Sequence, residues 1–443
     1  MCWLIDNFKN FDNNVVMVDD AKSYTYRELF FKIEEIERDL LPQIKKGEVV
    51  AIVGDYSFYD ISLILALYKH KNIIVPIASK VQSEVEDRVK ESFSTKIITI
   101  KNDNYIVTSK ELNETHQMIV SLQKNSSSGL ILFSSGSTGK PKAMIHNFEN
   151  LVNHYKDKKE KSMNMLLFLM FDHIGGLNTL LNILSMGATM IVPTSRNADD
   201  ICKLVQDYKI RVLPSSPTFL NLILMSKADE KYDLKSLRMI TYGTEAMPES
   251  LLLRLKEKFP KTKFLQTFGT SETGIANASS KSSNSTFMKM DDPNLEYKIV
   301  KNELWLKSNT QVMGYLNASM ESFEDGWFKT GDLVETTDDG YLKIIGRSKE
   351  VINVGGEKVL PNEVESIILS IPQIEDAMVY GEKNVITGQS VVCDVVTDVD
   401  KKEIKKIVRA YCKDRLDKYK IPTKVNVVEK TNFSDRFKKM RIK

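Results

Sequence analysis

A dense run of glycines, hydroxyls and lysines between residues 134 and 142 is the strongest chemical signal in the chain. It reads Ser-Ser-Gly-Ser-Thr-Gly-Lys-Pro-Lys and follows an apolar segment at residues 129–133. Such an apolar lead-in predicts a buried strand, and the loop after it would offer backbone N–H groups, hydroxyls and ammonium groups to phosphate. The expected ligand is a nucleoside triphosphate.

A Walker A loop is the obvious alternative, and the sequence excludes it. That motif needs Gly-Lys followed by Ser or Thr and then a helix. Here Pro141 follows Lys140, and proline has no N–H to donate and disfavours helical geometry at the residue before it. An ordinary flexible Gly/Ser linker remains the other interpretation of this segment taken alone.

Size and composition indicate a soluble protein of two or three domains. The chain has 443 residues, 42% hydrophobic and 27% charged. The start shows no basic region before an apolar core, and the longest strongly apolar run, residues 165–171, is far below the roughly 20 residues of a membrane helix. Four scattered cysteines without CxxC spacing predict reduced thiols, no metal cluster and a cytoplasmic protein.

The net charge of +3 hides an excess of positive charge near the C-terminus. Residues 401–443 contain 16 Lys/Arg against 5 Asp/Glu. This segment is either a solvated basic face or a surface that meets an anionic partner. No stacking platform or nucleic-acid motif accompanies these lysines, so binding to nucleic acid is not expected.

Buried strands and amphipathic helices alternate along the first half of the chain. Strands are expected within residues 47–55, 72–76, 188–193 and 210–213, and helices at 61–70, 199–208 and after Pro217. Continuous β-branched runs between helices predict sheets covered on both faces, hence an α/β fold. Residues 279–284 are expected to form a short polar loop.

The second half predicts a β-rich subdomain and then a separate small domain. The β-rich part includes residues 303–306 and 340–345. Beyond Gly346-Arg347-Ser348-Lys349 the pattern is a strand, a helix from Pro361, strands at 377–380 and 390–396, a helix from Asp400 and a basic tail. We therefore expect a large N-terminal domain, residues 1–347, and a small mobile α+β domain, residues 348–443.

Five further motifs follow the glycine-rich loop in a fixed order. They lie at residues 241–246 (TYGTEA), 266–274 (QTFGTSETG), 326–332 (GWFKTGD), 346–349 (GRSK) and 353–359 (NVGGEKV). Their order and spacing resemble the adenylate-forming, or AMP-binding, superfamily of acyl- and aryl-CoA synthetases, peptide-synthetase adenylation domains and luciferases. The resemblance runs from about residue 23 to the C-terminus.

This resemblance implies a two-step ligase that uses ATP and Mg²⁺. A small carboxylic acid would attack the α-phosphate of ATP, giving an acyl-AMP and pyrophosphate, and a thiol would then take the acyl group. The implied ATP-binding residues are Ser134, Ser135, Gly136, Ser137, Thr138, Gly139, Lys140, Lys142, Gly243, Thr244, Glu245, Phe268, Gly269, Thr270, Asp332 and Arg347.

Within that set the resemblance assigns individual roles. Thr270 would bond the α-phosphate and Glu272 would hold Mg²⁺, both as catalytic groups. Phe268 would stack on adenine, with the backbone of residues 243–245 at its edge. Asp332 would accept the ribose hydroxyls, with Arg347 beside it.

The resemblance also implies that the small domain rotates between the two steps. Lys349 would be the hinge, and Gly355, Gly356 and Glu357 would line the thiol tunnel. Lys438 would be the catalytic lysine of the adenylation step. The terminal motif departs from the family pattern, because Asn432 replaces proline and Phe437 replaces glycine, so Lys439 and a generic basic tail remain alternatives.

The acid and the acceptor are only partly constrained. His173 falls on the aromatic or histidine position of the CoA-ligase pattern and would gate or line the acyl pocket, as a fourth catalytic group; a histidine buried in the core with its hydrogen bonds satisfied is the alternative. Ile174 then occupies the position where amino-acid-activating members carry aspartate. An apolar residue there does not neutralise an ammonium group, so Asp172 is not expected to bind one.

Two kinds of acceptor and three classes of function stay open. CoA is the expected acceptor, and the alternative is the phosphopantetheine of an acidic carrier protein supplied in trans, with an amino acid as a possible substrate. A non-catalytic nucleotide-binding protein of the same fold is a second class, suggested by Phe437 and Asn432. A P-loop phosphotransferase or ATPase, a third class, would release ADP rather than AMP.

Overall fold

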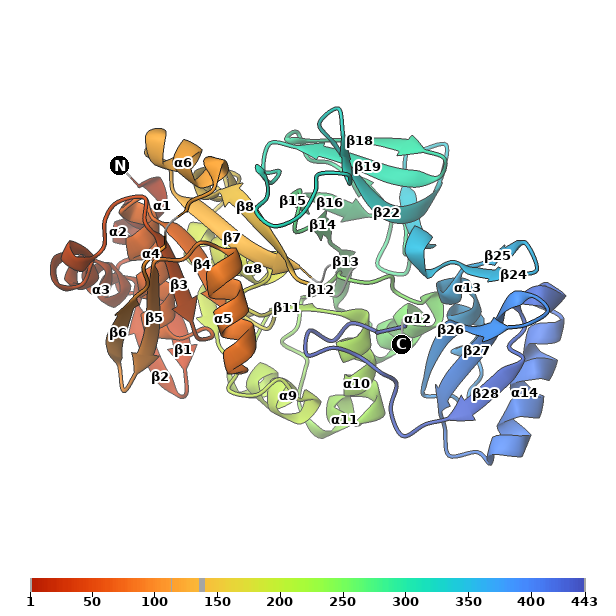
Figure 1. Cartoon of the computed structure of the whole chain (residues 1–443). Helices are drawn as coiled ribbons and strands as arrows, with labels where there is room; N and C mark the ends of the chain where they lie inside the picture. Colours follow the sequence, from red (N-terminus) through yellow and green to blue (C-terminus); the bar gives the residue numbers. More distant parts are fainter. Residues whose placement is uncertain (1, 113, 135–139, 442–443) are drawn as a thin grey trace.

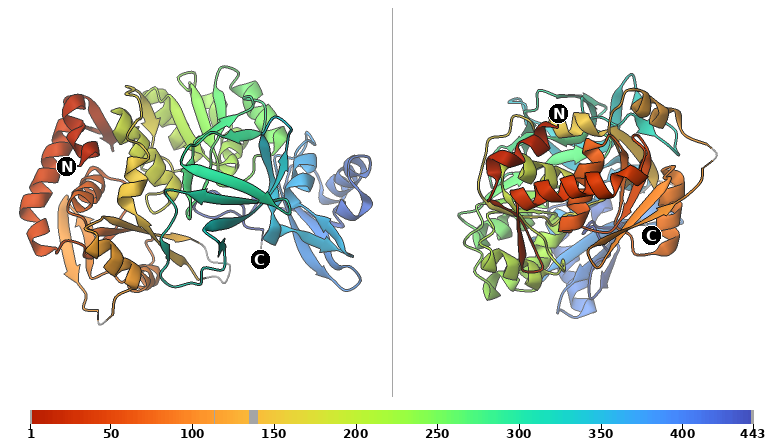
Figure 2. Two further views of the ribbon diagram at one scale, coloured as in Figure 1. Left: turned by 90° about the horizontal axis from the view of Figure 1, so that it is seen from above. Right: turned by 90° about the vertical axis from the view of Figure 1, so that its left-hand side faces the viewer.

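The computed structural model describes residues 2–112, 114–134 and 140–441. The chain folds into a large α/β part, a β-rich subdomain and a small C-terminal α+β domain (Figure 1). The views in Figure 2 place the small domain at the opposite end of the molecule from the first helices. The expected α/β fold class is confirmed.

One seven-stranded sheet carries the glycine-rich segment. Its order is β20-β8-β7-β4-β3-β5-β6, in which β3, β4, β5 and β7 are parallel. The strands are β3 (Val49–Val53), β4 (Ile73–Ile77), β5 (Lys96–Lys101), β6 (Asn104–Ser109), β7 (Gly129–Ser134), β8 (Lys142–Asn147) and β20 (Gly314–Tyr315). Strands β3, β4 and β7 are almost wholly buried because apolar clusters lie on both faces of the sheet.

A second seven-stranded sheet lies beside the first, in the order β13-β12-β11-β9-β10-β1-β2. Its strands are β1 (Val15–Asp19), β2 (Lys22–Thr25), β9 (Asn164–Leu166), β10 (Thr189–Ile191), β11 (Val212–Ser215), β12 (Met239–Tyr242) and β13 (Lys263–Gln266). All neighbours except β1 and β2 pair in parallel. The loops after β11, β12 and β13 therefore leave the same edge, where ligands of parallel sheets commonly bind.

Helices complete the large part. They are α1 (Trp3–Asp6), α2 (Phe8–Phe11), α3 (Tyr26–Asp39), η1 (Leu41–Gln43), α4 (Phe58–Lys69), α5 (Gln82–Glu91), α6 (Gln117–Lys124), α7 (Phe148–Asn153), α8 (Ile174–Met186), α9 (Ala198–Asp207), α10 (Pro217–Met225), α11 (Ala228–Lys231) and α12 (Glu249–Lys258).

The β-rich subdomain is a twisted sheet in the order β16-β17-β23-β22-β19-β18, with β21 beside β22. Its strands are β16 (Ala278–Ser280), β17 (Met288–Met290), β18 (Leu295–Val300), β19 (Glu303–Ser308), β21 (Phe323–Glu324), β22 (Trp327–Thr336) and β23 (Leu342–Arg347). A separate hairpin joins β14 (Phe268–Thr270) and β15 (Gly274–Ala276). The prediction of a loop at 279–284 is wrong at its start, because Ser279 and Ser280 pair with β17.

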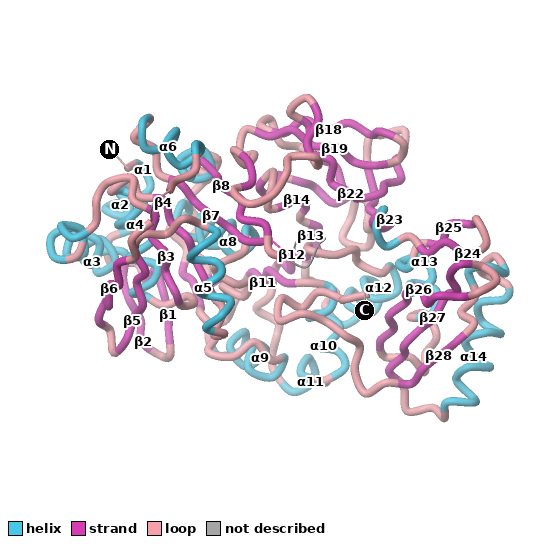
Figure 3. The backbone as a smooth tube through the Cα atoms, in the orientation of Figure 1, coloured by secondary structure: helices cyan, strands magenta, loops and turns pink. Residues whose placement is uncertain are grey.

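The small domain contains a five-stranded sheet in the order β25-β24-β27-β26, with β28 beside β27. Its elements are η2 (Ser348–Glu350), β24 (Ile352–Val354), β25 (Glu357–Val359), α13 (Pro361–Ile368), β26 (Asp376–Asn384), β27 (Gly388–Val396), α14 (Lys401–Lys413), η3 (Lys418–Lys420) and β28 (Lys424–Val427). After β28 the chain runs as loop back to the middle of the molecule, close to α10 and α12 (Figure 3). The boundary between residues 347 and 348 stays a prediction.

Candidate active site

Asp332 and Arg347 face each other across two neighbouring strands. They are register partners on β22 and β23, and Arg347 Nε donates to Asp332 Oδ1 at 3.0 Å. Asp332 is only 4% exposed. Burial raises the pKa of its carboxyl, against the opposing fields of Arg347 and Lys438. The pair thus presents a buried acceptor beside a half-exposed guanidinium, a suitable arrangement for a ribose.

Glu272 and the glycine-rich segment are connected through one tyrosine. Tyr315, on β20, donates its hydroxyl to Glu272 Oε1 at 3.1 Å. Lys142 Nζ lies 4.7 Å from the centre of the Tyr315 ring, at a distance typical of cation–π attraction. Lys142 is also the register partner of Ser134 at the ends of β7 and β8. The carboxylate assigned to the metal and the lysine assigned to phosphate thus share a support, Tyr315, that no sequence motif indicated.

The described part of the glycine-rich segment consists of its two ends. Ser134 ends β7, Lys142 begins β8 and Lys140 is exposed. The remaining residues assigned to phosphate binding, Ser135, Gly136, Ser137, Thr138 and Gly139, lie outside the described residues.

The residues assigned to adenine and the α-phosphate lie in the loop after β12 and in the short strand β14 that follows β13. Gly243 closely approaches the neighbouring loop, because a Cβ atom there would stand 2.8 Å from the Thr267 carbonyl oxygen. Thr244 has a positive φ of 71°. Phe268 is partly buried against the apolar cluster of the β-rich subdomain. Thr270 Oγ1, at the end of β14, lies 2.9 Å from Thr273 Oγ1.

Glu245 has a side-chain role that the sequence did not indicate. Its carboxylate accepts hydrogen bonds from the backbone N–H and hydroxyl of Thr218, at the start of α10. The other carboxylate oxygen accepts the backbone N–H of Lys439 at 3.1 Å. Glu245 therefore joins the large domain to the C-terminal tail.

The tail folds into a tight hairpin that carries Lys438. Ser434 N–H bonds to the Lys438 carbonyl, Phe437 N–H bonds to the Ser434 carbonyl, and Phe433 and Lys439 form a bridge. This is a turn followed by a left-handed residue, Phe437, with φ of 52°. The left-handed position is where the family motif carries glycine.

Lys438 lies among charged residues that include those assigned to the nucleotide. Burial lowers the pKa of its ammonium group and the Arg347 charge lowers it further, whereas Glu245, Glu350 and Asp332 oppose that change. The structure thus brings Lys438 into the electrostatic neighbourhood of Asp332 and Arg347, the residues assigned to the ribose.

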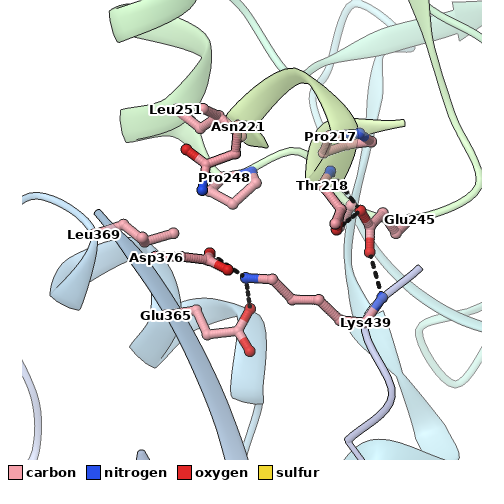
Figure 4. Close-up of a pocket in the computed structure, with 11 residues that line it drawn as sticks. Pro217, Thr218, Asn221, Glu245, Pro248, Leu251, Glu365, Leu369, Asp376 and Lys439 are labelled. Carbon is pink, nitrogen blue, oxygen red and sulfur yellow. Dashed lines mark hydrogen bonds and ion pairs between the residues drawn. The ribbon is translucent and has the colours of Figure 1, made fainter. Parts of the chain in front are cut away.

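Lys439 points the other way, into the small domain (Figure 4). Its Nζ lies 3.1 Å from Asp376 and 3.8 Å from Glu365, and it donates to the Ala377 carbonyl at 2.5 Å. Arg441 makes a second contact with Glu365 at 2.8 Å. Burial would lower the pKa of Lys439, but Asp376 and Glu365 outweigh it, and the net pKa is raised. The ammonium group of Lys439 is therefore engaged in ion pairs within the small domain.

His173 and Asp172 lie at the start of α8. His173 is the N-cap, and its Nδ1 accepts the Gly175 N–H at 3.1 Å. Burial, assisted by the Arg436 charge, lowers the pKa of His173 to about 4. Asp172 is 3% exposed and pairs with Arg88 at 2.9 Å and Arg436 at 3.2 Å. Two arginines therefore already neutralise this carboxylate.

The residues assigned to hinge and tunnel lie elsewhere in this arrangement. Lys349 is in η2, directly after β23. Gly355 and Gly356 form the turn between β24 and β25, with φ of 61° and 95°, and Glu357 begins β25 and is exposed. In Figure 1 this hairpin lies at the outer edge of the small domain, away from β12 and β13. The roles of these residues stay predictions.

Comparison with known proteins identifies the family. The AMP-binding enzyme family matches residues 5–316, and the AMP-binding enzyme C-terminal domain matches residues 363–434. A 2-succinylbenzoate–CoA ligase of Bacillus licheniformis is 31% identical over 71% of this chain and 69% of its own length. The corresponding ligase of Bacillus pumilus is 24% identical over 100% of this chain and 97% of its own.

Solved structures share the fold. The anthranilate CoA ligase AuaEII in complex with anthranoyl-AMP superposes with a TM-score of 0.82 at 18% identity, over 98% of this chain and 95% of that one. The o-succinylbenzoate CoA synthetase of Bacillus subtilis with its acyl-adenylate gives a TM-score of 0.76 at 22% identity, over 99% of this chain and 96% of that one.

Within the described residues no helix is long and apolar enough to cross a membrane. The chain belongs to the AMP-binding enzyme family, as its six motifs predicted.

Proposed function

We infer that this protein is an AMP-forming acid–thiol ligase that converts a carboxylic acid and CoA to a thioester. The family match and the CoA-ligase relatives support the activity. The single structural observation that supports it best is the C-terminal hairpin that carries Lys438, which Glu245 holds against the large domain through the Lys439 N–H. There the ammonium group of Lys438 is within the electrostatic reach of the Asp332–Arg347 pair.

The first step forms a bond between a carboxylate oxygen of the acid and the α-phosphorus of ATP. The bond from that phosphorus to the bridging oxygen breaks, and pyrophosphate leaves. Negative charge on the transferring group needs preorganised cations and donors. Lys438 is the cation, Thr270 is a hydroxyl donor, and Asp332 with Arg347 holds the ribose.

Glu272 fits a magnesium site of the kind that substrate phosphates complete. Mg²⁺ is usually held by one or two carboxylates together with phosphate oxygens and waters. Among the described residues no group of three or more His, Cys, Asp or Glu side chains could hold a metal alone. One carboxylate steadied by Tyr315 matches a metal that arrives with ATP, where it would neutralise phosphate charge. A related synthetase was solved with ATP and a magnesium ion.

The substrate proposed is an acid without an α-amino group. Asp172, the carboxylate closest in sequence to the amino-acid-binding position, is already paired with Arg88 and Arg436. A buried ammonium group would therefore find no free acidic partner there. Aryl and acyl acids, including 2-succinylbenzoate and anthranilate, form the first panel because related ligases are named for them.

In the second step the thiol sulfur attacks the acyl carbon, and AMP leaves. CoA is the proposed acceptor. A carrier protein bearing phosphopantetheine is the second candidate, favoured by the basic face of α14, where Lys401, Lys402, Lys406 and Arg409 are exposed. A carrier would dock by salt-sensitive attraction over that broad surface.

Carboxylate-dependent exchange of labelled pyrophosphate into ATP tests the first step. A ligase shows exchange with some acid of the panel, and its product is AMP. Release of ADP would overturn the proposal in favour of a phosphotransferase. Absence of exchange across the panel, with ATP bound, would favour the non-catalytic alternative. Thioester formation with CoA and with a purified carrier, at low and high salt, then identifies the acceptor.

A further inference from the structure

The C-terminal hairpin is attached to the large domain by the two residues immediately before Lys438. Phe437 packs between Phe168, in the loop after β9, and Phe219, on α10, with ring centroids 5.4 and 5.0 Å apart. Phe168 is 1% exposed and Phe219 is fully buried. Phe437 thus joins the apolar core of the large domain although it belongs to the small domain's tail.

Arg436 makes the second attachment. It lies 3.2 Å from Asp172, whose side chain is 4% exposed. Asp172 is already compensated by Arg88, also from the large domain, at 2.9 Å. The second arginine is therefore unnecessary for neutralising the carboxylate. It adds an attraction that exists only while the tail lies against the large domain.

Phe437 occupies a backbone conformation that aromatic residues avoid. Its φ of 52° is left-handed, where glycine carries no Cβ penalty. The backbone conformation favours glycine at this position, and glycine is the residue that the family motif carries there. The aromatic ring offsets the backbone cost only if its contacts with Phe168 and Phe219 form. The docked arrangement of the tail is therefore the one that these contacts stabilise.

We propose that Phe437 and Arg436 are positioning residues for Lys438, holding it beside Asp332 for the adenylation step. The inference rests on the proposed function, in which Lys438 is the cation of the first step. Loss of either anchor lowers the population of the docked tail and so slows adenylation. It should not slow thioester formation from acyl-adenylate already made, because Lys438 has no role in that step, for which the family resemblance implies the other orientation of the small domain.

The experiment compares Phe437→Gly, Phe437→Tyr and Arg436→Gln with wild type. Glycine relieves the left-handed backbone while removing the ring. Arg436→Gln leaves no unpaired buried charge, because Asp172 keeps Arg88. Phe93→Gly is the matched control, since Phe93 is also partly buried with a φ of 57° but packs near His116, in the large domain.

We expect Phe437→Gly to reduce pyrophosphate exchange at least tenfold through kcat, with KM for ATP and thioester formation from preformed acyl-adenylate within twofold of wild type. Arg436→Gln should reduce pyrophosphate exchange by a smaller factor than Phe437→Gly. Phe437→Tyr should retain most of the pyrophosphate exchange of wild type. Phe93→Gly should leave the ratio of the two half-reactions unchanged, whatever its effect on the urea midpoint. Unchanged exchange in Phe437→Gly, or equal loss of both half-reactions, would overturn the proposal.

Hydrogen exchange of residues 432–440, in protein without substrates, gives a readout independent of activity. If these contacts hold the tail, hydrogen exchange of residues 432–440 should be at least tenfold faster in Phe437→Gly and Arg436→Gln. It should be unchanged in Phe93→Gly. If wild type shows no pyrophosphate exchange, the proposed function fails, while faster tail exchange still supports the anchoring. Unchanged tail exchange would refute the anchoring even in an active enzyme.

Discussion

Lys438 and Lys439 are neighbours in the sequence, and replacing each by alanine should have different effects. We expect Lys438→Ala to impair catalysis and Lys439→Ala to impair stability. Lys438 is the ammonium group in the field of Asp332 and Arg347. Loss of one preorganised charge or donor typically costs about 10²- to 10³-fold in rate. We expect that loss in pyrophosphate exchange for Lys438→Ala, with thioester formation from preformed acyl-adenylate retained.

The stability of Lys438→Ala should equal or exceed that of wild type. The pKa of Lys438 is lowered in the folded protein, so the folded state holds the charged form less readily than the unfolded chain. At a pH below the ordinary pKa of lysine, the weaker proton binding of the folded state lowers the free energy of unfolding. Replacing Lys438 by alanine removes this destabilising contribution.

Lys439→Ala should behave in the opposite way. The side chain is 8% exposed and pairs with Asp376 and Glu365. Removing one partner of a buried ion pair costs about 3–5 kcal/mol, and Arg441 remains on Glu365, so the lower end applies. We expect a fall of about 3 kcal/mol in the free energy of unfolding, with pyrophosphate exchange of the folded fraction within a few-fold of wild type.

Urea unfolding and the two half-reactions, measured on both variants, decide the assignment. Lys439→Met provides the matched control, because it nearly keeps the volume of the side chain while removing the charge and the hydrogen bond to the Ala377 carbonyl. The reasoning fails if Lys439→Ala abolishes exchange at unchanged stability while Lys438→Ala remains active. In that case the second lysine of the pair would be the catalytic one.

Three further substitutions and one pH profile test the rest of the site. Glu272→Gln should raise the Mg²⁺ concentration needed for half-maximal exchange, because a neutral amide binds the metal less well; an unchanged requirement contradicts the assignment. Asp332→Asn should weaken ATP binding by calorimetry at least tenfold, and equal affinity would remove it from the ribose site. Gly356→Leu should block thioester formation and spare exchange: no atom lies within 4 Å of its Cβ position here, and the strain of a side chain at a φ of 95° is confined to the exposed turn between β24 and β25; loss of both steps in a folded variant would refute the tunnel. Burial lowers the pKa of His146, on β8, to about 4, so the unfolded state binds more protons between pH 6.5 and 4. His146 should contribute about 3 kcal/mol to the fall in the free energy of unfolding as the pH drops through that window, beside a similar contribution from His173. In His146→Gln the fall should be smaller by that contribution, and an equal fall would show that other groups cause it.

Much of the fold follows from local pattern. Apolar runs such as residues 49–53 and 129–133 have no polar alternation, and each became a strand buried on both faces. The helix expected from Pro361 begins there because proline at the first helical position lacks only an N–H that would be unbonded anyway. Ser279 and Ser280 were assigned wrongly because a short polar strand has no periodic signal. Pairing with β17 decides its conformation.

The site was predictable wherever one short motif supplies the residue. Asp332 and Arg347 belong to two motifs, and their adjacency follows from the β22–β23 hairpin. The supports around them were not predictable. Tyr315 lies outside every motif, and Arg436 meets Asp172 across 264 positions of sequence. Contacts of that range depend on how sheets and domains pack, which local periodicity does not encode.

Phe437 shows why a broken local rule does not by itself indicate lost function. A left-handed non-glycine residue costs about 1–2 kcal/mol, whereas aromatic pairs contribute about 0.5–1.5 kcal/mol each beyond the area they bury. Contacts with Phe168 and Phe219 can therefore offset the backbone cost. The hairpin that places Lys438 keeps its turn without glycine. The substitution that suggested a non-catalytic protein from sequence is consequently compatible with a docked catalytic lysine, and the choice between the two functions depends on Lys438 rather than on Phe437.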